Sequence, residues 1–240
     1  MDIFFLTLLT FLTSIVGTIT GFGISTIMVP VVLLFLPLPQ TLLLVGVIHW
    51  FGDLWKMLLF KHGVNKKLLL YFGLPGVIAA ILGAMLVVRI PETIGQEIVG
   101  LIIISYVIFH HFKPKFKLRA NSNTYILGGI SSGFLAGLTG VGGGALRSVI
   151  LLAINIPKDI YIFTSGALGA FIDASRISTY LFSGVKINQN LIWGFLVFIP
   201  ASFLGAEVAK KIVDLVPQKK FILLVNLFLF ILGIKLILFP

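Results

Sequence analysis

Runs of about 20 apolar residues recur along almost the whole chain, and this is the length of an α-helix that crosses a lipid bilayer. Of the 240 residues, 58% are hydrophobic and only 11% are charged, more apolar surface than a soluble domain needs. The sequence therefore predicts an all-α, polytopic protein, integral to the cytoplasmic (inner) membrane. Its first residues lack the basic start of a secretory signal peptide and are interpreted as the beginning of the first membrane segment.

Two apolar segments, residues 3–37 and 124–156, are interrupted by glycines. The first contains Gly17-Thr-Ile-Thr-Gly-Phe-Gly23, and the second has four glycines within residues 140–144. Each arm of the first segment is then about 14 residues, too short for an ordinary span. Glycine is costly inside a helix, and broken backbone at membrane depth is tolerated only beside protein or a water-filled cavity. A helix that restarts at Gly143 or Gly144 would direct N–H groups at such a cavity, which favours an anion site. The alternative is close helix packing through small residues.

The remaining apolar segments predict unbroken helices, and the sequence elements repeat. The helices are expected at 40–60, 68–88, 93–112, 160–182, 188–209 and 218–239. Thr20-Gly-Phe-Gly23 matches Thr139-Gly-Val-Gly142 at an offset of 119 (139 − 20), and Asp53…Lys56 matches Asp173…Arg176 at 120 (173 − 53). We therefore predict two homologous membrane repeats, residues 1–114 and 123–240, joined by a basic linker at 115–122.

Loop charges predict how the repeats are oriented. If each broken segment forms a hairpin, twelve loop cations share one side and only Arg89 and Lys186 lie opposite. If each broken segment crosses once, the same cations divide 8 to 6. Cytoplasmic loops carry the excess of Lys and Arg, so the hairpin arrangement is favoured. It places both termini outside and residues 113–122 in the cytoplasm. Three crossings per repeat invert the second repeat, an arrangement found in secondary transporters.

The chain resembles the sulfite exporter TauE/SafE family, also called the TSUP family of membrane transporters. The resemblance covers the two similar halves, with Gly21-Phe-Gly-Ile-Ser-Thr-Ile-Met-Val-Pro30 in the first and Gly140-Val-Gly-Gly-Gly144 in the second. It implies transport of small sulfur-containing anions such as sulfite or sulfonates, or of related organic acids, and no enzymatic activity. The chain differs from the family pattern at Ile24-Ser25, where a glycine pair is common, and at Val149, where a proline is expected.

Arg147 is the charge that most needs an explanation, because it follows the second glycine cluster by about one turn and lies far from the loop ends. A charge at the bilayer centre costs about 2.5–3.5 kcal/mol even on the lenient insertion scale. Either a bound anion or an internal carboxylate would offset this cost. The matching position in the first half is Met28, so this cation belongs to the second half alone.

Two further pairs of opposite charge, Asp53 with Lys56 and Asp173 with Arg176, have the i,i+3 spacing of one helix face. The cations would line the pathway while the carboxylates hold them, or an aspartate would carry the coupling proton. The alternative is a self-neutralised pair near an interface, with the long side chain snorkelling. His49, four residues before Asp53, offers at most two metal ligands with it and is interpreted as part of a polar network. No metal or other cofactor site is predicted.

We therefore predict a secondary transporter that moves a small anion by alternating access, with a coupling proton or sodium as a possible partner. A passive anion channel needs the same site and stays open as an alternative, and a membrane enzyme or assembly factor would show converging His and acidic residues. Hydroxyls at the breaks would donate to the anion or cap the half-helices. The predicted anion-binding residues are Thr20, Gly21, Gly23, Ser25, Lys56, Thr139, Gly140, Gly142, Gly143, Gly144, Arg147 and Arg176, and the predicted coupling or ion-pair residues are Asp53 and Asp173.

Overall fold

The described part of the computed structural model is mainly helical and contains no strand, which confirms the predicted all-α class. The model describes residues 2–20, 23–60, 65–113, 117–154, 158–212, 215 and 218–239. The elements are α1 (Ile3–Thr20), α2 (Ser25–Val32), α3 (Leu38–Leu59), α4 (Lys66–Leu68), the π-helical turn η1 (Leu69–Gly73), α5 (Leu74–Val87), α6 (Glu92–Phe112), α7 (Ser122–Thr139), α8 (Gly142–Ala153), α9 (Lys158–Phe182), α10 (Gln189–Ile212) and α11 (Gln218–Leu238).

Four of the described helical segments are long and apolar enough to cross a membrane. They are α3, the continuous stretch from α4 to α5, residues 92–109 of α6, and α10. Large apolar side chains such as Leu82, Leu101 and Leu196 are more than half exposed on the outside of the bundle. In a bilayer these side chains would face lipid tails, so their exposure is the expected outer surface of a membrane protein.

Both predicted breaks are present, and each has a glycine with positive φ. Gly23 has φ +83° before α2, and Gly140 has φ +67° between α7 and α8. This left-handed backbone favours glycine because it has no Cβ. Gly17 stays helical, and its carbonyl accepts the Gly23 N–H at 3.2 Å, which folds the break back onto α1.

Both broken segments have unequal arms, so the prediction of about 14 residues for each arm of the first segment is wrong. α1 has 18 residues and α2 has 8, whereas α7 has 18 and α8 has 12. The physical reason is that each turn occurs where a glycine has positive φ, at Gly23 and at Gly140, whereas Gly17 and Gly137 before them remain helical. After Gly140, α8 restarts at Gly142, slightly before the predicted Gly143 or Gly144.

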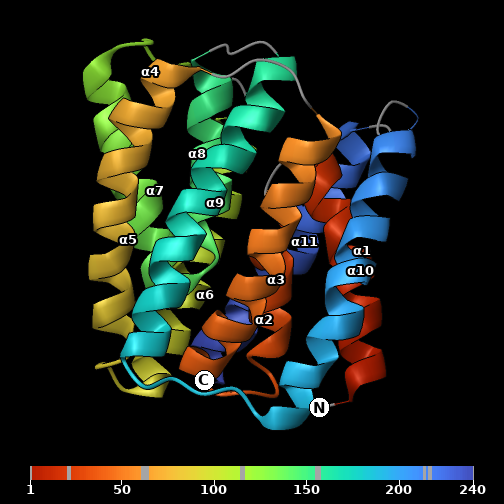
Figure 1. Cartoon of the computed structure of the whole chain (residues 1–240). Coiled ribbons are helices and arrows are strands. Elements are labelled where there is room, and N and C mark those ends of the chain that lie inside the picture. The colour runs from red at the N-terminus through yellow and green to blue at the C-terminus, as the bar shows by residue number, and fades with distance from the viewer. Residues whose placement is uncertain are drawn as a thin grey trace.

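The two ends of the chain lie at the same end of the bundle, and α4 lies at the opposite end (Figure 1). α1 enters from the N-terminal end and α2 returns toward it, while α7 and α8 form a hairpin from the other end (Figure 1). α5 packs on α7, α10 on α1, α3 on α9, and α6 on α11. Exchanging the two predicted halves maps these pairs onto one another, so the packing has the symmetry of a twofold repeat. That the second repeat is inverted remains a prediction. The repeat boundaries themselves remain a prediction.

The contact between α5 and α7 depends on glycine. A Cβ added at Gly133 of α7 would overlap the carbonyl oxygen of Gly76 in α5, and one at Gly137 would overlap that of Ala80. In both places the overlapping atom belongs to the backbone of α5, so no flexible side chain can move aside to admit the Cβ. Close packing through small residues therefore explains Gly137, whereas the break explains Gly140, and the two interpretations of this glycine cluster apply to different residues.

We expect Gly133→Val to destabilise the protein by about 3 kcal/mol or more, because α5 and α7 must separate to admit the side chain. Thermal unfolding of the purified protein in detergent measures the effect. Ser131→Val is the matched control, since Ser131 is exposed on the same helix. Equal melting temperatures for the two variants would contradict this packing.

Candidate functional site

Six ionisable side chains gather in the interior of the bundle. None is more than 4% exposed, and among the described residues no other ionisable side chain that carries charge near neutral pH is buried. They come from α3, α8 and α9, so both predicted halves contribute. The six are His49, Asp53, Lys56, Arg147, Asp173 and Arg176.

The two predicted i,i+3 pairs are formed, one on each of two neighbouring helices. Lys56 Nζ lies 2.8 Å from Asp53 Oδ1 on α3, and Arg176 Nε lies 2.7 Å from Asp173 Oδ1 on α9. Lys56 is buried, so it does not snorkel to an interface. Each carboxylate therefore holds a cation inside the bundle, as the pathway interpretation expects.

Arg147 joins α8 to both of these helices. Its Nη2 lies 3.5 Å from Asp53 Oδ2 on α3, and its Nε donates to Ser165 Oγ on α9 at 3.3 Å. The buried charge of Arg147 therefore faces an internal carboxylate, which is one of the two groups that the sequence analysis expected to offset its cost. Asp53 is shared with Lys56, however, so Arg147 has no carboxylate of its own.

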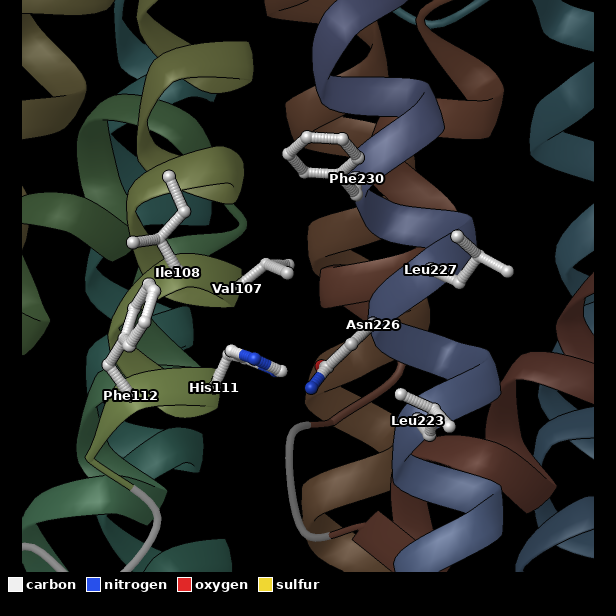
Figure 2. Close-up of a pocket in the computed structure, with 8 residues that line it drawn as sticks. All are labelled: Val107, Ile108, His111, Phe112, Leu223, Asn226, Leu227 and Phe230. Atoms are coloured by element: carbon white, nitrogen blue, oxygen red, sulfur yellow. The ribbon is translucent and has the colours of Figure 1, made fainter.

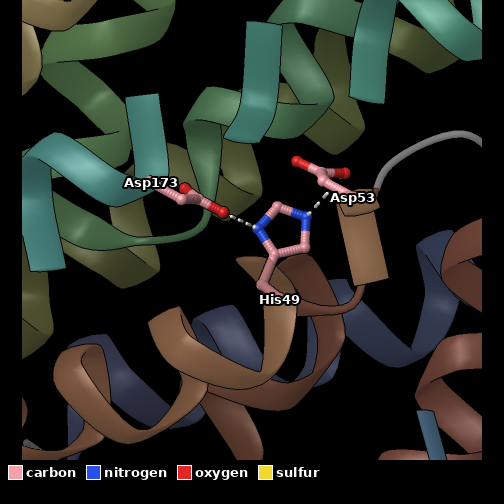
Figure 3. Close-up of side chains that lie close together, drawn as sticks. All are labelled: His49, Asp53 and Asp173. Atoms are coloured by element: carbon pink, nitrogen blue, oxygen red, sulfur yellow. Dashed lines mark ion pairs between the residues drawn. The ribbon is translucent and has the colours of Figure 1, made fainter. Parts of the chain in front are cut away.

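His49 lies between the two carboxylates (Figure 3). Its Nδ1 is 2.8 Å from Asp173 Oδ2, its Nε2 is 3.8 Å from Asp53 Oδ1, and Ser25 Oγ is 3.4 Å from Nδ1. The polar-network interpretation of His49 is confirmed. The sequence did not predict the contact between His49 and Asp173, which are 124 residues apart (173 − 49). The one sequence feature that points to it is the repeat match between Asp53, which lies on the same helix as His49, and Asp173.

The same three residues also bring possible metal ligands within 4.8 Å of one another. This is the convergence of His and acidic residues that a membrane enzyme or assembly factor would show. Lys56 and Arg147 contact Asp53, and Arg176 contacts Asp173. A metal cation would have to displace or face these positive groups, so the donor set suits an anion better than a metal.

Glycines leave the space that these charges occupy. A Cβ at Gly23 would overlap His49 Nε2, and one at Gly169 would overlap Asp53 Oδ2. At Gly140 a Cβ would lie 3.5 Å from Arg176 Nη1. Both helix breaks therefore reach the charge cluster, one at His49 and the other at Arg176.

Arg176 Nη1 is buried and has no hydrogen-bond partner among the described residues. Its guanidinium has five donors, of which Nε donates to Asp173, and Nη1 is the nitrogen of this group that is left without a partner in the described part of the chain. An unmade hydrogen bond to a buried charged group is costly. This donor, beside the Gly140 break, is therefore the best-placed group in the cluster for an anionic oxygen.

The breaks also contact each other directly. Thr26 Oγ1 in the first turn of α2 donates to the Val141 carbonyl at 3.4 Å. A cavity of about 10 Å³ lies beside them, bounded also by Ala145 and Tyr106. Such a space holds about one water molecule.

Comparison with known proteins assigns the chain to a family. The family model for the sulfite exporter TauE/SafE matches residues 6–236. The chain belongs to the sulfite exporter TauE/SafE family. Members of this family are membrane transporters, which together with the apolar helices makes the chain an integral membrane transport protein. Neither a search of the curated proteins nor one of the solved structures found a match.

The hydroxyls predicted at the breaks of this TauE/SafE chain differ in their roles. Thr139 Oγ1 donates to the Leu135 carbonyl at 2.9 Å and accepts the Val141 N–H at 3.3 Å, so it caps the end of α7. Ser25 faces His49 at the cluster. The side chain of Thr20 and the residue Gly21 lie outside the described part of the chain, while Gly142, Gly143 and Gly144 form the first turn of α8.

A larger cavity of about 250 Å³ lies elsewhere in this TauE/SafE chain, between α6 and α11 (Figure 2). Its walls are mostly apolar, with His111 and Asn226 as the polar side chains. Several lining residues, such as Phe112 and Leu223, are exposed on the outside of the bundle. None of the six clustered residues lines this cavity, so it is not the candidate anion site.

Proposed function

We propose that the chain is a secondary transporter that moves a small sulfur-containing or organic anion, such as sulfite or a sulfonate, across the cytoplasmic membrane by alternating access. The observation that carries this proposal is the buried charge cluster at the meeting point of the two helix breaks. Among the described side chains its three permanent cations face only two carboxylates, so within this part of the chain one positive charge is uncompensated when His49 is neutral. A buried surplus charge is costly, and a bound anion removes that cost.

The donors of the cluster suit an oxyanion. Guanidinium groups donate from a rigid planar fork that matches carboxylate and oxyanion geometry. Arg176 Nη1 lies beside Gly140 and has no hydrogen-bond partner among the described residues. The distance between Arg147 Nη2 and the nearest oxygen of Asp53 is 3.5 Å, which is long for a contact with a carboxylate. A sulfite or sulfonate group has three oxygens and would accept from both arginines. Asp53 and Asp173 then hold the cations in place.

The burial of the cluster supports alternating access over a permanently open pore. None of the six side chains is more than 4% exposed, so an anion in bulk water needs a rearrangement of the bundle to reach them. The cluster is divided between α3 on one side and α8 and α9 on the other. Rocking of one half against the other would therefore open and close it.

Flux into liposomes tests the proposal. The purified protein should transport sulfite, thiosulfate, a sulfonate or a carboxylate with saturable kinetics, and the flux should follow a proton or sodium gradient. Flux that rises linearly with concentration and ignores both gradients would instead establish the passive channel. Absence of flux for every anion in this panel would contradict the proposal.

Cysteine labelling tests the proposed orientation of the chain. The sequence has no cysteine, so a single introduced thiol gives no background. With both termini outside, Lys186→Cys, an exposed position between α9 and α10, should react with a membrane-impermeant maleimide in intact cells. Lys113→Cys, at the end of α6, should react only after permeabilisation. The opposite pattern would invert the orientation.

A further inference from the structure

We propose that His49 is the binding site of a coupling proton, and that this proton and the anion bind to the cluster together. The inference rests on the proposed function and adds a coupling ion and its site. It starts from the position of His49, the single buried histidine among the described residues with a carboxylate on each side. One carboxylate, Asp53, is on its own helix, and the other, Asp173, comes from the opposite half of the bundle.

Every charged group near His49 responds to its protonation. Asp53 and Asp173 face the ring directly, and Ser25 of α2 contributes only a hydroxyl. Behind the carboxylates lie the cations, with Lys56 and Arg147 on Asp53 and Arg176 on Asp173. No other described element brings a charged side chain to the ring.

A neutral imidazole can donate to only one carboxylate, whereas an imidazolium donates to both. Nε2 is 3.8 Å from Asp53 Oδ1 and has no hydrogen-bond partner among the described residues. A proton on this nitrogen would give the ring a second charge-assisted contact. The protonated ring then neutralises part of both carboxylates and weakens their hold on Arg147 and Arg176.

The consequence is positive cooperativity between proton and anion. Arginine donors released from the carboxylates become available to the anion, and the extra positive charge attracts it. Linkage makes the effect reciprocal, so a bound anion must raise the affinity of His49 for its proton. Histidine serves in many proteins as a reversible proton carrier, which is the role proposed here for His49. Proton and anion would therefore cross the membrane in the same direction.

Binding measurements at several pH values test this inference independently of flux. Methanesulfonate and thiosulfate are suitable probes, because neither changes its own charge between about pH 5 and pH 9. For the wild-type protein in detergent, calorimetry should show anion affinity rising by up to about tenfold per unit fall in pH, with uptake of up to one proton per anion. His49→Asn should bind the anion with an affinity that no longer depends on pH. His111→Asn, which changes an exposed histidine outside the cluster, should keep the wild-type slope.

The outcomes separate the two proposals. Wild-type binding without proton uptake overturns the coupling role of His49 and leaves the anion site intact. A His49→Asn variant that keeps the slope also overturns it and assigns the proton to a carboxylate. If His49→Asn does not fold, proton uptake by the wild-type protein still decides for or against a coupled proton. Absence of binding for both probes, for sulfite and for a carboxylate, at every pH, overturns the proposed function and this inference with it.

Discussion

Replacing Arg147 by glutamine should lower the affinity of the purified protein for its anion by about 10- to 100-fold and leave the fold intact. The substitution removes the surplus positive charge of the cluster. It creates no orphan carboxylate, because Asp53 keeps Lys56 at 2.8 Å. A hydrogen bond to a charged group contributes about 1.5–3 kcal/mol, and each ~1.4 kcal/mol is a factor of ten in affinity. Calorimetric titration with the anion measures the loss.

Arg89→Gln is the matched control, since Arg89 is an exposed arginine that follows α5. It removes the same charge from the chain and should change the affinity by less than about twofold at moderate salt, because exposed charges are screened. Arg147→Lys should fall between the two, because an ammonium keeps the charge and loses the planar fork. Wild-type affinity in Arg147→Gln would show that Arg147 serves only as an ion-pair partner of Asp53.

The fold was largely predictable because a membrane simplifies the physical problem. Apolar runs had to become helices, and glycine clusters within them had to become breaks. The residue at which each helix breaks was harder to predict, because the sequence does not distinguish the glycines of each cluster from one another. They are Gly17, Gly21, Gly23, Gly137 and Gly140. Which of them turns the chain depends on contacts that only the assembled bundle provides, such as α5 against Gly137.

The charged residues of the candidate site and their local pairs could be predicted from the sequence. The contacts that join these pairs to one another could not. Lys56 with Asp53 and Arg176 with Asp173 follow from helix periodicity, which is local. The contact between Arg147 and Asp53 spans 94 residues and depends on how α8 packs against α9, which in turn packs on α3. Gly169 is a second example, because its contact with Asp53 has no signature in the sequence.

A second large effect is expected at Asp173. Asp173→Asn leaves Arg176 in the interior with no carboxylate and should destabilise the protein by about 3–5 kcal/mol, as breaking a buried pair does. Thermal unfolding in detergent measures the loss. Glu207→Gln is the control, since Glu207 forms an exposed pair with Lys211 at 3.1 Å and its loss should cost less than about 1 kcal/mol.

The double variant Asp173→Asn with Arg176→Gln then separates stability from transport. Removing both partners leaves two neutral polar groups that can bond to each other, so most of the lost stability should return. Transport should not return, because the donor beside Gly140 has gone with the guanidinium. A double variant as unstable as Asp173→Asn would mean that Asp173 stabilises the protein mainly through His49. A stable double variant with wild-type flux would remove Arg176 from the anion site and leave Arg147 as its remaining arginine.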